Sequence, residues 1–165
     1  MGYTTEFEGK FTVTPPLDAN QVAYLNAFSK TRRMKRREDL AYTLQDPIRE
    51  AVGLPIGTEA EFFVGGGGFL GQDRDPSIAE YNIPPRTQPS LWCQWVPTDD
   101  GDAVEWNESE KFYCYTEWLN YIIANMLTPW GRTISGRVLY RGEELRDVGA
   151  IEIVDGKAVR VEAKL

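Results

Sequence analysis

The stretch YTTEFEGKFTV, residues 3–13, alternates between apolar and polar side chains. On an extended strand, Tyr3, Phe7, Phe11 and Val13 would share one face, and the polar side chains between them would share the other. Strict alternation of this kind is typical of an antiparallel strand with one solvent-exposed face. We therefore expect an antiparallel or mixed sheet, and the rest of the fold is predicted outward from this strand.

A helix is expected directly after the first strand. Asp18, followed three residues later by Gln21, matches a capping box, and Val22, Leu25 and Phe28 form an apolar stripe at helical spacing. The signal then weakens over the next fifty residues. It indicates a short helix within residues 39–52, a strand at 59–64 and a loop-rich excursion at 65–89, where glycine and proline gather.

The second half of the chain has a clearer pattern. Residues 91–96 and 103–106 are predicted to be strands joined by an acidic turn, and residues 109–127 form a helix with a wide apolar stripe. An Asn107–Glu110 capping box would begin that helix. Three further strands are expected after it.

The turn between the last two strands decides which side chains share a face. A two-residue turn at 155–156 would set Glu152 opposite Val159 and mix the faces, whereas a three-residue loop at 154–156 sets Ile151 opposite Val159. We prefer the three-residue loop. The whole pattern predicts an α+β fold, with a sheet of about five to six strands packed against two main helices, in a single domain over residues 1–165.

Composition excludes several classes of site. The chain contains no histidine, which removes Ser-His-Asp triads, Cys-His pairs and histidine-ligated metals. Its two cysteines, Cys93 and Cys114, lie in apolar segments and are interpreted as buried free thiols. We expect no cofactor and no metal. We also expect a cytoplasmic protein without a membrane span, because no apolar run is long enough.

One basic segment stands out in an acidic protein. The net charge is −7, yet residues 30–37 carry six positive charges, including Arg32, Arg33, Arg36 and Arg37. The segment is a candidate for binding phosphate or nucleic acid. Three alternatives stay open: a solvated helix end, pairing with the acidic stretch at 99–110, or docking of an acidic partner protein.

A glycine-rich stretch matches G-x-G-x-x-G at Gly66, Gly68 and Gly71. A dinucleotide site requires a helix to follow, whereas a polar segment that ends in proline follows here, so we interpret the stretch as a surface loop. Asp73 and Asp75 come directly after it. They are the candidate acid, base or metal ligand if the loop and the basic segment share a pocket.

All five tryptophans lie within residues 92–130. Trp92 and Trp95 would point to opposite faces of a regular strand, so at least one is expected to leave the main core. An exposed tryptophan beside Tyr113 would make a good interface anchor. We therefore name Trp92, Trp95, Trp106 and Tyr113 as candidate interface residues, with coverage by a second layer as the alternative.

Three stretches together resemble a family of uncharacterised bacterial and phage proteins of similar size: TRRMKR at 31–36, LWCQW at 91–95, and EKFY at 110–113 running on to PWG at 129–131. The resemblance implies a bacterial or phage origin and carries no activity. Our first hypothesis is a non-enzymatic protein that binds another protein, one version being a phage or mobile-element factor that acts on a host system. The alternative is a binder or enzyme for a nucleotide or another phosphorylated ligand, and nucleic-acid binding is the third.

Overall fold

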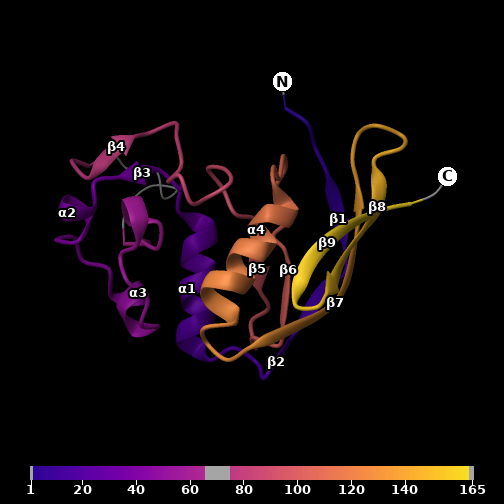
Figure 1. Ribbon diagram of the computed structural model, residues 1–165, viewed down its shortest axis with the longest axis horizontal. Coiled ribbons are helices and arrows are strands. Elements are labelled where there is room, and N and C mark those ends of the chain that lie inside the picture. Colours follow the sequence, from indigo (N-terminus) through magenta and orange to yellow (C-terminus); the bar gives the residue numbers. More distant parts are fainter. Residues whose placement is uncertain (1, 66–74, 164–165) are drawn as a thin grey trace. The chain divides into compact units, whose positions relative to one another are not determined.

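The computed structural model describes residues 2–65 and 75–163 and confirms the α+β class (Figure 1). It divides into two compact units. The first comprises Met1–Asp18 and Gln94–Leu165, and the second comprises Ala19–Cys93. We expected one domain over residues 1–165. Whether the two units form one domain depends on how they join, so the single domain stays a prediction.

The first unit is built on an antiparallel sheet of seven strands. Its order is β5 (Trp95–Pro97), β6 (Ala103–Trp106), β2 (Lys10–Thr14), β7 (Thr133–Arg141), β8 (Val148–Val154) and β9 (Lys157–Glu162), and β1 (Glu6–Glu8) also pairs with β7. Seven strands exceed the predicted five to six because the first strand is interrupted. Gly9, with a φ of +107°, separates β1 from β2, and a Cβ there would lie 3.2 Å from the carbonyl oxygen of Arg137.

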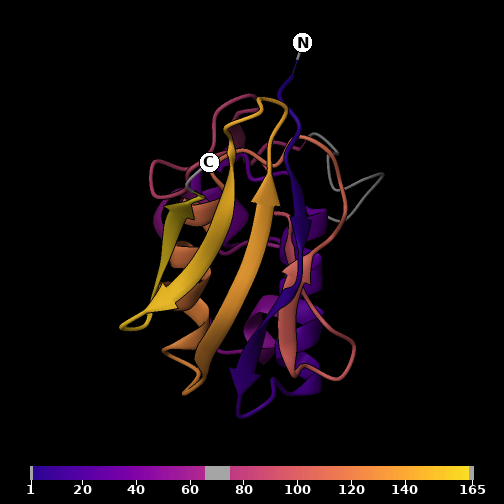
Figure 2. The same ribbon diagram turned by 90° about the vertical axis from the view of Figure 1, so that its right-hand side faces the viewer.

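Helix α4 (Tyr115–Ile122) covers one face of the sheet and continues as a π-helical turn, Ile123–Leu127 (Figure 2). We call the covered face of the sheet the inner face. The apolar stripe of α4 is buried as predicted, with Trp118 and Leu119 at the centre of the stripe. The helix begins at Tyr115 rather than at residue 109, because Cys114 adopts a left-handed conformation with a φ of 57°.

An aromatic cluster fills the inner face beside β1. The ring of Phe7 meets four others edge-on, at centroid distances of 5.4 Å to Trp95, 5.3 Å to Trp106, 5.8 Å to Phe112 and 4.9 Å to Tyr115. Edge-to-face contacts of this kind add to the energy of burial. The inward alternation predicted for residues 3–13 therefore produces this cluster.

The β8–β9 connection corrects our prediction. The structure has the two-residue turn, with Val154 opposite Lys157 and Glu152 opposite Val159, and the preferred three-residue loop is wrong. Asp155 and Gly156 have φ values of 51° and 78°, as a type I′ turn requires. Because this register holds, Val159 lies on the outer face, away from α4.

The second unit contains little regular structure. Its elements are α1 (Ala19–Lys30), β3 (Lys35–Arg36), α2 (Glu38–Ala41), α3 (Pro47–Ala51), a 3₁₀ turn at Thr58–Ala60 and β4 (Ile78–Glu80). Helix α1 buries Tyr24, Leu25 and Phe28, whereas Val22 of the predicted stripe is half-buried. The strand predicted at 59–64 is wrong, because Glu59 and Ala60 are left-handed and the chain turns.

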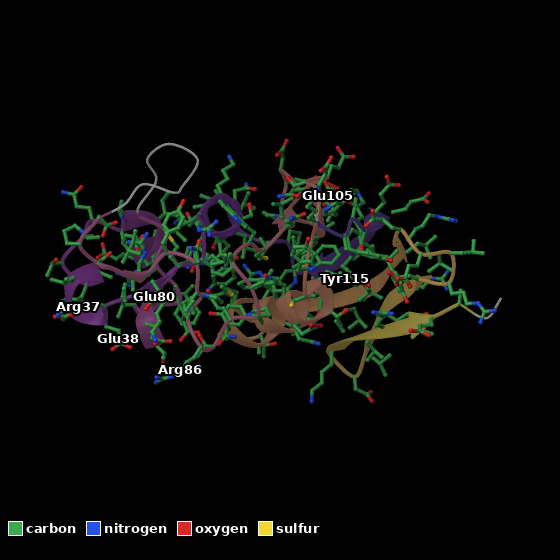
Figure 3. The ribbon with its side chains drawn as sticks, turned by 90° about the horizontal axis from the view of Figure 1, so that it is seen from above. Arg37, Glu38, Glu80, Arg86, Glu105 and Tyr115 are labelled. Atoms are coloured by element: carbon green, nitrogen blue, oxygen red, sulfur yellow. The ribbon has the colours of Figure 1, made fainter. Side chains whose placement is uncertain are left out.

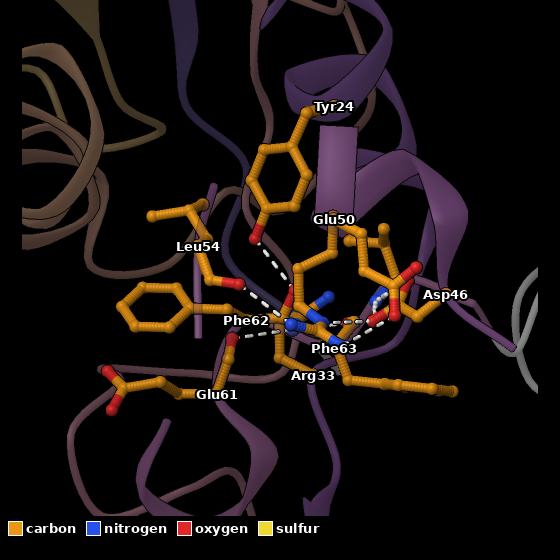
Figure 4. A network of polar contacts seen from close by, with 10 residues as sticks. Tyr24, Arg33, Asp46, Glu50, Leu54, Glu61, Phe62 and Phe63 are labelled. Atoms are coloured by element: carbon orange, nitrogen blue, oxygen red, sulfur yellow. Dashed lines mark hydrogen bonds and ion pairs between the residues drawn. The ribbon is translucent and has the colours of Figure 1, made fainter. Parts of the chain in front are cut away.

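Buried side chains hold the irregular backbone of the second unit in place (Figure 4). The Nη2 group of Arg33 donates to the carbonyls of Glu61 and Phe63, at 2.7 and 2.9 Å, and the hydroxyl of Tyr24 donates to the carbonyl of Phe62 at 2.8 Å. These bonds satisfy carbonyls that a strand ladder would otherwise satisfy. The segment predicted as a strand is therefore fixed by side chains instead.

Candidate functional site

The basic segment is largely internal rather than an open patch. Arg33 and Arg36 are buried, at 2% and 3% exposure. Arg36 donates from Nη1 to Asp75 at 2.9 Å and to the hydroxyl of Ser77 at 2.6 Å, and its guanidinium lies 4.5 Å from the ring of Phe63. Two of the four arginines predicted to bind a ligand therefore hold the second unit together.

The other basic residues are more exposed and also engaged. Arg32 lies 4.4 Å above the ring of Tyr81 and donates to the carbonyl of that residue at 3.1 Å. Arg37 pairs with Asp39 at 3.3 Å and points outward beside Glu38 (Figure 3). Exposed pairs of this kind contribute little stability, and the side chain of Arg37 stays 60% exposed.

Asp75, the predicted acid or metal ligand, is held in its ionised form. Burial opposes ionisation, but hydrogen bonds from Ser77 and Arg36 outweigh burial and lower the pKa of the Asp75 carboxyl. A carboxyl with a lowered pKa is a poor general acid. The remaining predicted ligand residues, Gly66, Gly68, Gly71 and Asp73, lie outside the described residues.

The four candidate interface aromatics do not form one exposed patch. Trp95 is buried and donates from Nε1 to the carbonyl of Tyr115 at 2.8 Å. Trp106 is half-buried against the aromatic cluster, and Trp92 is half-buried in the second unit. Tyr113 is 47% exposed. Trp95 is therefore a core residue, and of these four only Tyr113 is largely open to solvent.

The outer face of the sheet carries an unexpected apolar row. Leu139 of β7 lies opposite Ala150 of β8, which in turn lies opposite Val161 of β9, and Glu8 of β1 lies on the other side of Leu139. Leu139 and Val161 are 44% and 43% exposed. The solvent face of an antiparallel sheet is normally polar, so a row of this kind is a candidate contact surface.

Charged side chains of both signs border the apolar row. Arg137 lies opposite Glu152, with their charged groups 3.8 Å apart, and Glu6 lies opposite Arg141. Together the row and its borders line a groove of about 620 Å³ across β1, β7, β8 and β9. Figure 2 looks onto this face. We call it the outer groove.

The sequence contained a signal for the outer groove that we misinterpreted. The two-residue turn was rejected because it placed Val159 opposite Glu152, away from the core. That mixing of faces is real, and it is what brings apolar side chains to the solvent side of β9. Several apolar residues side by side on a solvent face are a candidate contact surface.

The described residues offer no metal site and no membrane span. Within 2–65 and 75–163, no group of three or more histidine, cysteine or acidic side chains is placed to hold a metal ion. Within the same ranges, no helix combines the length and the apolar character that crossing a membrane requires.

Comparison of the chain with protein families, curated proteins and solved structures gave no match. The resemblance to bacterial and phage proteins therefore stays a prediction.

Proposed function

We propose that this chain is a non-enzymatic protein that binds a segment of a partner protein in the outer groove. The observation that carries the proposal is the apolar row on the outer face, in which Leu139 and Val161 are exposed on either side of the buried Ala150. Covering the exposed parts of the leucine and the valine would contribute about 1 kcal/mol each. A row of this kind suits a weak, regulated contact.

The borders of the groove indicate the chemistry of the partner segment. Four carboxylates and two guanidinium groups line the groove, so negative charge prevails there: Glu6, Glu8, Glu152 and Glu162 against Arg137 and Arg141. A segment with apolar side chains flanked mainly by basic residues fits such borders. Nucleic acid and phosphorylated ligands require concentrated positive charge, which favours a protein partner.

The alternative function, binding of a phosphorylated ligand, has lost much of its support. It needs available guanidinium groups, whereas Arg33 donates to carbonyls and Arg36 to Asp75. Cys93 and Cys114 are thiols rather than partners in a disulfide, which supports a reducing compartment, so we keep the cytoplasm as part of the proposal.

Site-specific photocrosslinking tests the proposal. A photoreactive side chain at Leu139, inside the outer groove, is compared with the same group at Ser135, which is also exposed on β7 but does not line the groove. In nuclease-treated lysate we expect a discrete adduct with another protein from position 139 and none from position 135. Equal labelling from both positions would contradict the proposal.

A second probe separates binding from accidental proximity. With the photoreactive group at Arg141, another lining residue, Leu139→Lys should reduce the adduct by at least about tenfold, which corresponds to about 1.4 kcal/mol. Ser135→Lys is the matched control and should leave the adduct unchanged. An adduct that survives Leu139→Lys would show that the apolar row does not carry binding.

A further inference from the structure

Strand β9 ends the sheet on one side, and its hydrogen-bonding edge is only partly covered. The amide side chain of Asn120, on α4, covers the edge at Ala158. It donates to the carbonyl of Ala158 at 3.0 Å and accepts from its N–H at 2.8 Å, as a neighbouring strand would. Ala158 therefore directs both backbone groups away from β8.

The register of the hairpin extends this assignment along β9. In an antiparallel pair, alternate residues direct their backbone groups to the partner strand and away from it. The N–H of Ala163 donates to the carbonyl of Val148 at 2.9 Å, so the odd-numbered residues of β9 direct their backbone groups to β8. Arg160 and Glu162 therefore direct their backbone groups away from β8, as Ala158 does. Within residues 2–65 and 75–163, no residue forms a hydrogen bond with these backbone groups of Arg160 or Glu162.

The side chains around the open edge favour another strand rather than water. Val159 and Val161 are 41% and 43% exposed on the outer face. On the inner face, Arg160 and Glu162 pair with each other at 3.0 Å and are 42% and 69% exposed. Edge strands are usually protected by charged side chains, proline or bulges. Beyond Ala158, the protection of β9 (Lys157–Glu162) comes from Arg160 and Glu162, which carry opposite charges and therefore can also pair with a second copy of the same strand.

We propose that two copies of this chain pair through β9, antiparallel about a two-fold axis at Val161. In this register Arg160 of each copy lies opposite Glu162 of the other copy. Unlike charges therefore face each other at both positions, and the unpaired backbone N–H and C=O groups of the two residues can bond to each other. Moving the register by one pair in either direction sets Arg160 against Arg160 or Glu162 against Glu162. The two-fold arrangement also places the two Val161 side chains in contact at the axis.

Asn120 limits the length of the pairing. Because it occupies the edge at Ala158 in each copy, Arg160 and Glu162 are the residues of β9 left for pairing, which gives four backbone hydrogen bonds across the axis. Such a short interface predicts a weak, concentration-dependent dimer.

In the dimer, the outer faces of the two copies lie on the same side of the joined sheet, so the two apolar rows become continuous. The inference does not rest on the proposed function, because it uses the edge of β9 rather than a partner protein.

Cysteine pairs test the register directly. In the proposed pairing, Val161→Cys sets two thiols directly opposite each other, at a Cα separation within the range of a disulfide. Val159→Cys is the matched control, because Val159 lies four residues from its counterpart, about 13 Å along the strand. Under a glutathione redox buffer we expect Val161→Cys to give a covalent dimer of twice 18.7 kDa, and Val159→Cys and the wild type to stay monomeric. Equal crosslinking of both variants would overturn the proposal.

Light scattering of the unmodified protein provides the second measurement. We expect the average mass to rise from 18.7 kDa toward twice that value with concentration. Glu162→Pro removes an outward N–H that β8 does not use, so it should abolish the rise while leaving circular dichroism unchanged, and Glu162→Ala should keep most of it. A monomer up to about 1 mM, the upper end of weak complexes, would overturn the proposal. Crosslinking from Leu139 in Glu162→Pro tests the proposed function separately, since this variant changes one lining residue of the outer groove and keeps the apolar row of Leu139, Ala150 and Val161.

Discussion

Replacing Arg49 with methionine would remove the one positive charge bonded to a buried carboxylate. The Nε group of Arg49 donates to Asp46 at 2.6 Å, and its Nη1 group donates to the carbonyl of Leu54 at 2.7 Å. The side chain of Asp46 is fully buried, and among the residues that the structure describes its one other hydrogen-bond donor is the N–H of Val64, at 3.3 Å. Arg49→Met therefore leaves a buried carboxylate with one long hydrogen bond.

The expected cost follows from the loss of one partner in a buried pair. Such losses destabilise a protein by about 3–5 kcal/mol, a large fraction of the usual stability of about 5–15 kcal/mol. The double variant Asp46→Asn with Arg49→Met removes both charges and keeps an acceptor for Val64. It should cost only about 1–2 kcal/mol, mainly from the carbonyl of Leu54. Urea unfolding followed by circular dichroism measures both free energies.

The pH dependence gives the prediction a second signature. Burial raises the pKa of Asp46, and Arg49 opposes that rise, so Arg49→Met should raise the pKa further. A carboxyl with a higher pKa in the folded state contributes stability below its unfolded pKa of about 3.9 and loses it as the pH rises through the folded value. The stability gap between the wild type and Arg49→Met should therefore widen as the pH rises through the interval between the folded pKa of Asp46 in the wild type and its higher value in the variant.

The matched control is Arg137→Met, the same substitution at an exposed pair with Glu152. It should cost no more than about 1 kcal/mol. The reasoning would be refuted if Arg49→Met cost as little as this control. A double variant as destabilised as the sum of its two single variants would refute it too, because it would show that the buried charges do not interact.

Three further outcomes follow from the first unit. Asn120→Ala should destabilise the protein by about 1–2 kcal/mol in urea unfolding and speed hydrogen exchange at Ala158, and unchanged exchange would contradict the edge cover described for β9. Gly156→Ala should cost about 1–2 kcal/mol by the same assay, since its φ of 78° is left-handed and nothing crowds the site, and a neutral result would contradict the type I′ turn. Alkylation of Cys114 should be slower than that of a free thiol, because burial and then the charge of Glu117 raise its pKa, and Glu117→Gln should speed it; an unchanged rate would show that Glu117 has no influence.

The sequence predicted the elements whose side chains follow a simple period. The alternation of residues 3–13 and the wide stripe of α4 were interpreted correctly, since each buries one face against the same core. The prediction erred where burial is not periodic. Residues 59–64 look like a strand because Phe62, Phe63 and Val64 are apolar, yet carbonyls of that segment are bonded by Arg33 and Tyr24.

The basic segment shows why the candidate site was harder to predict than the fold. Six positive charges in residues 30–37 indicate an exposed surface, because charged side chains are rarely buried. Arg33 and Arg36 are buried because guanidinium groups can donate to several carbonyls of an irregular backbone at once. No local pattern reports where those carbonyls lie, so the role of these arginines emerges only from the tertiary structure.

The place of β2 in the sheet has a consequence for how the protein is made. Phe11 of β2 lies opposite Val104 of β6 on one side and Gly136 of β7 on the other. During synthesis, β2 therefore stays without either neighbour while the ribosome adds the second unit, and without β7 until α4 has also been added. Pairing between such distant segments is slow and leaves apolar strands open to aggregation. A strand made early thus depends on two neighbours that are made much later.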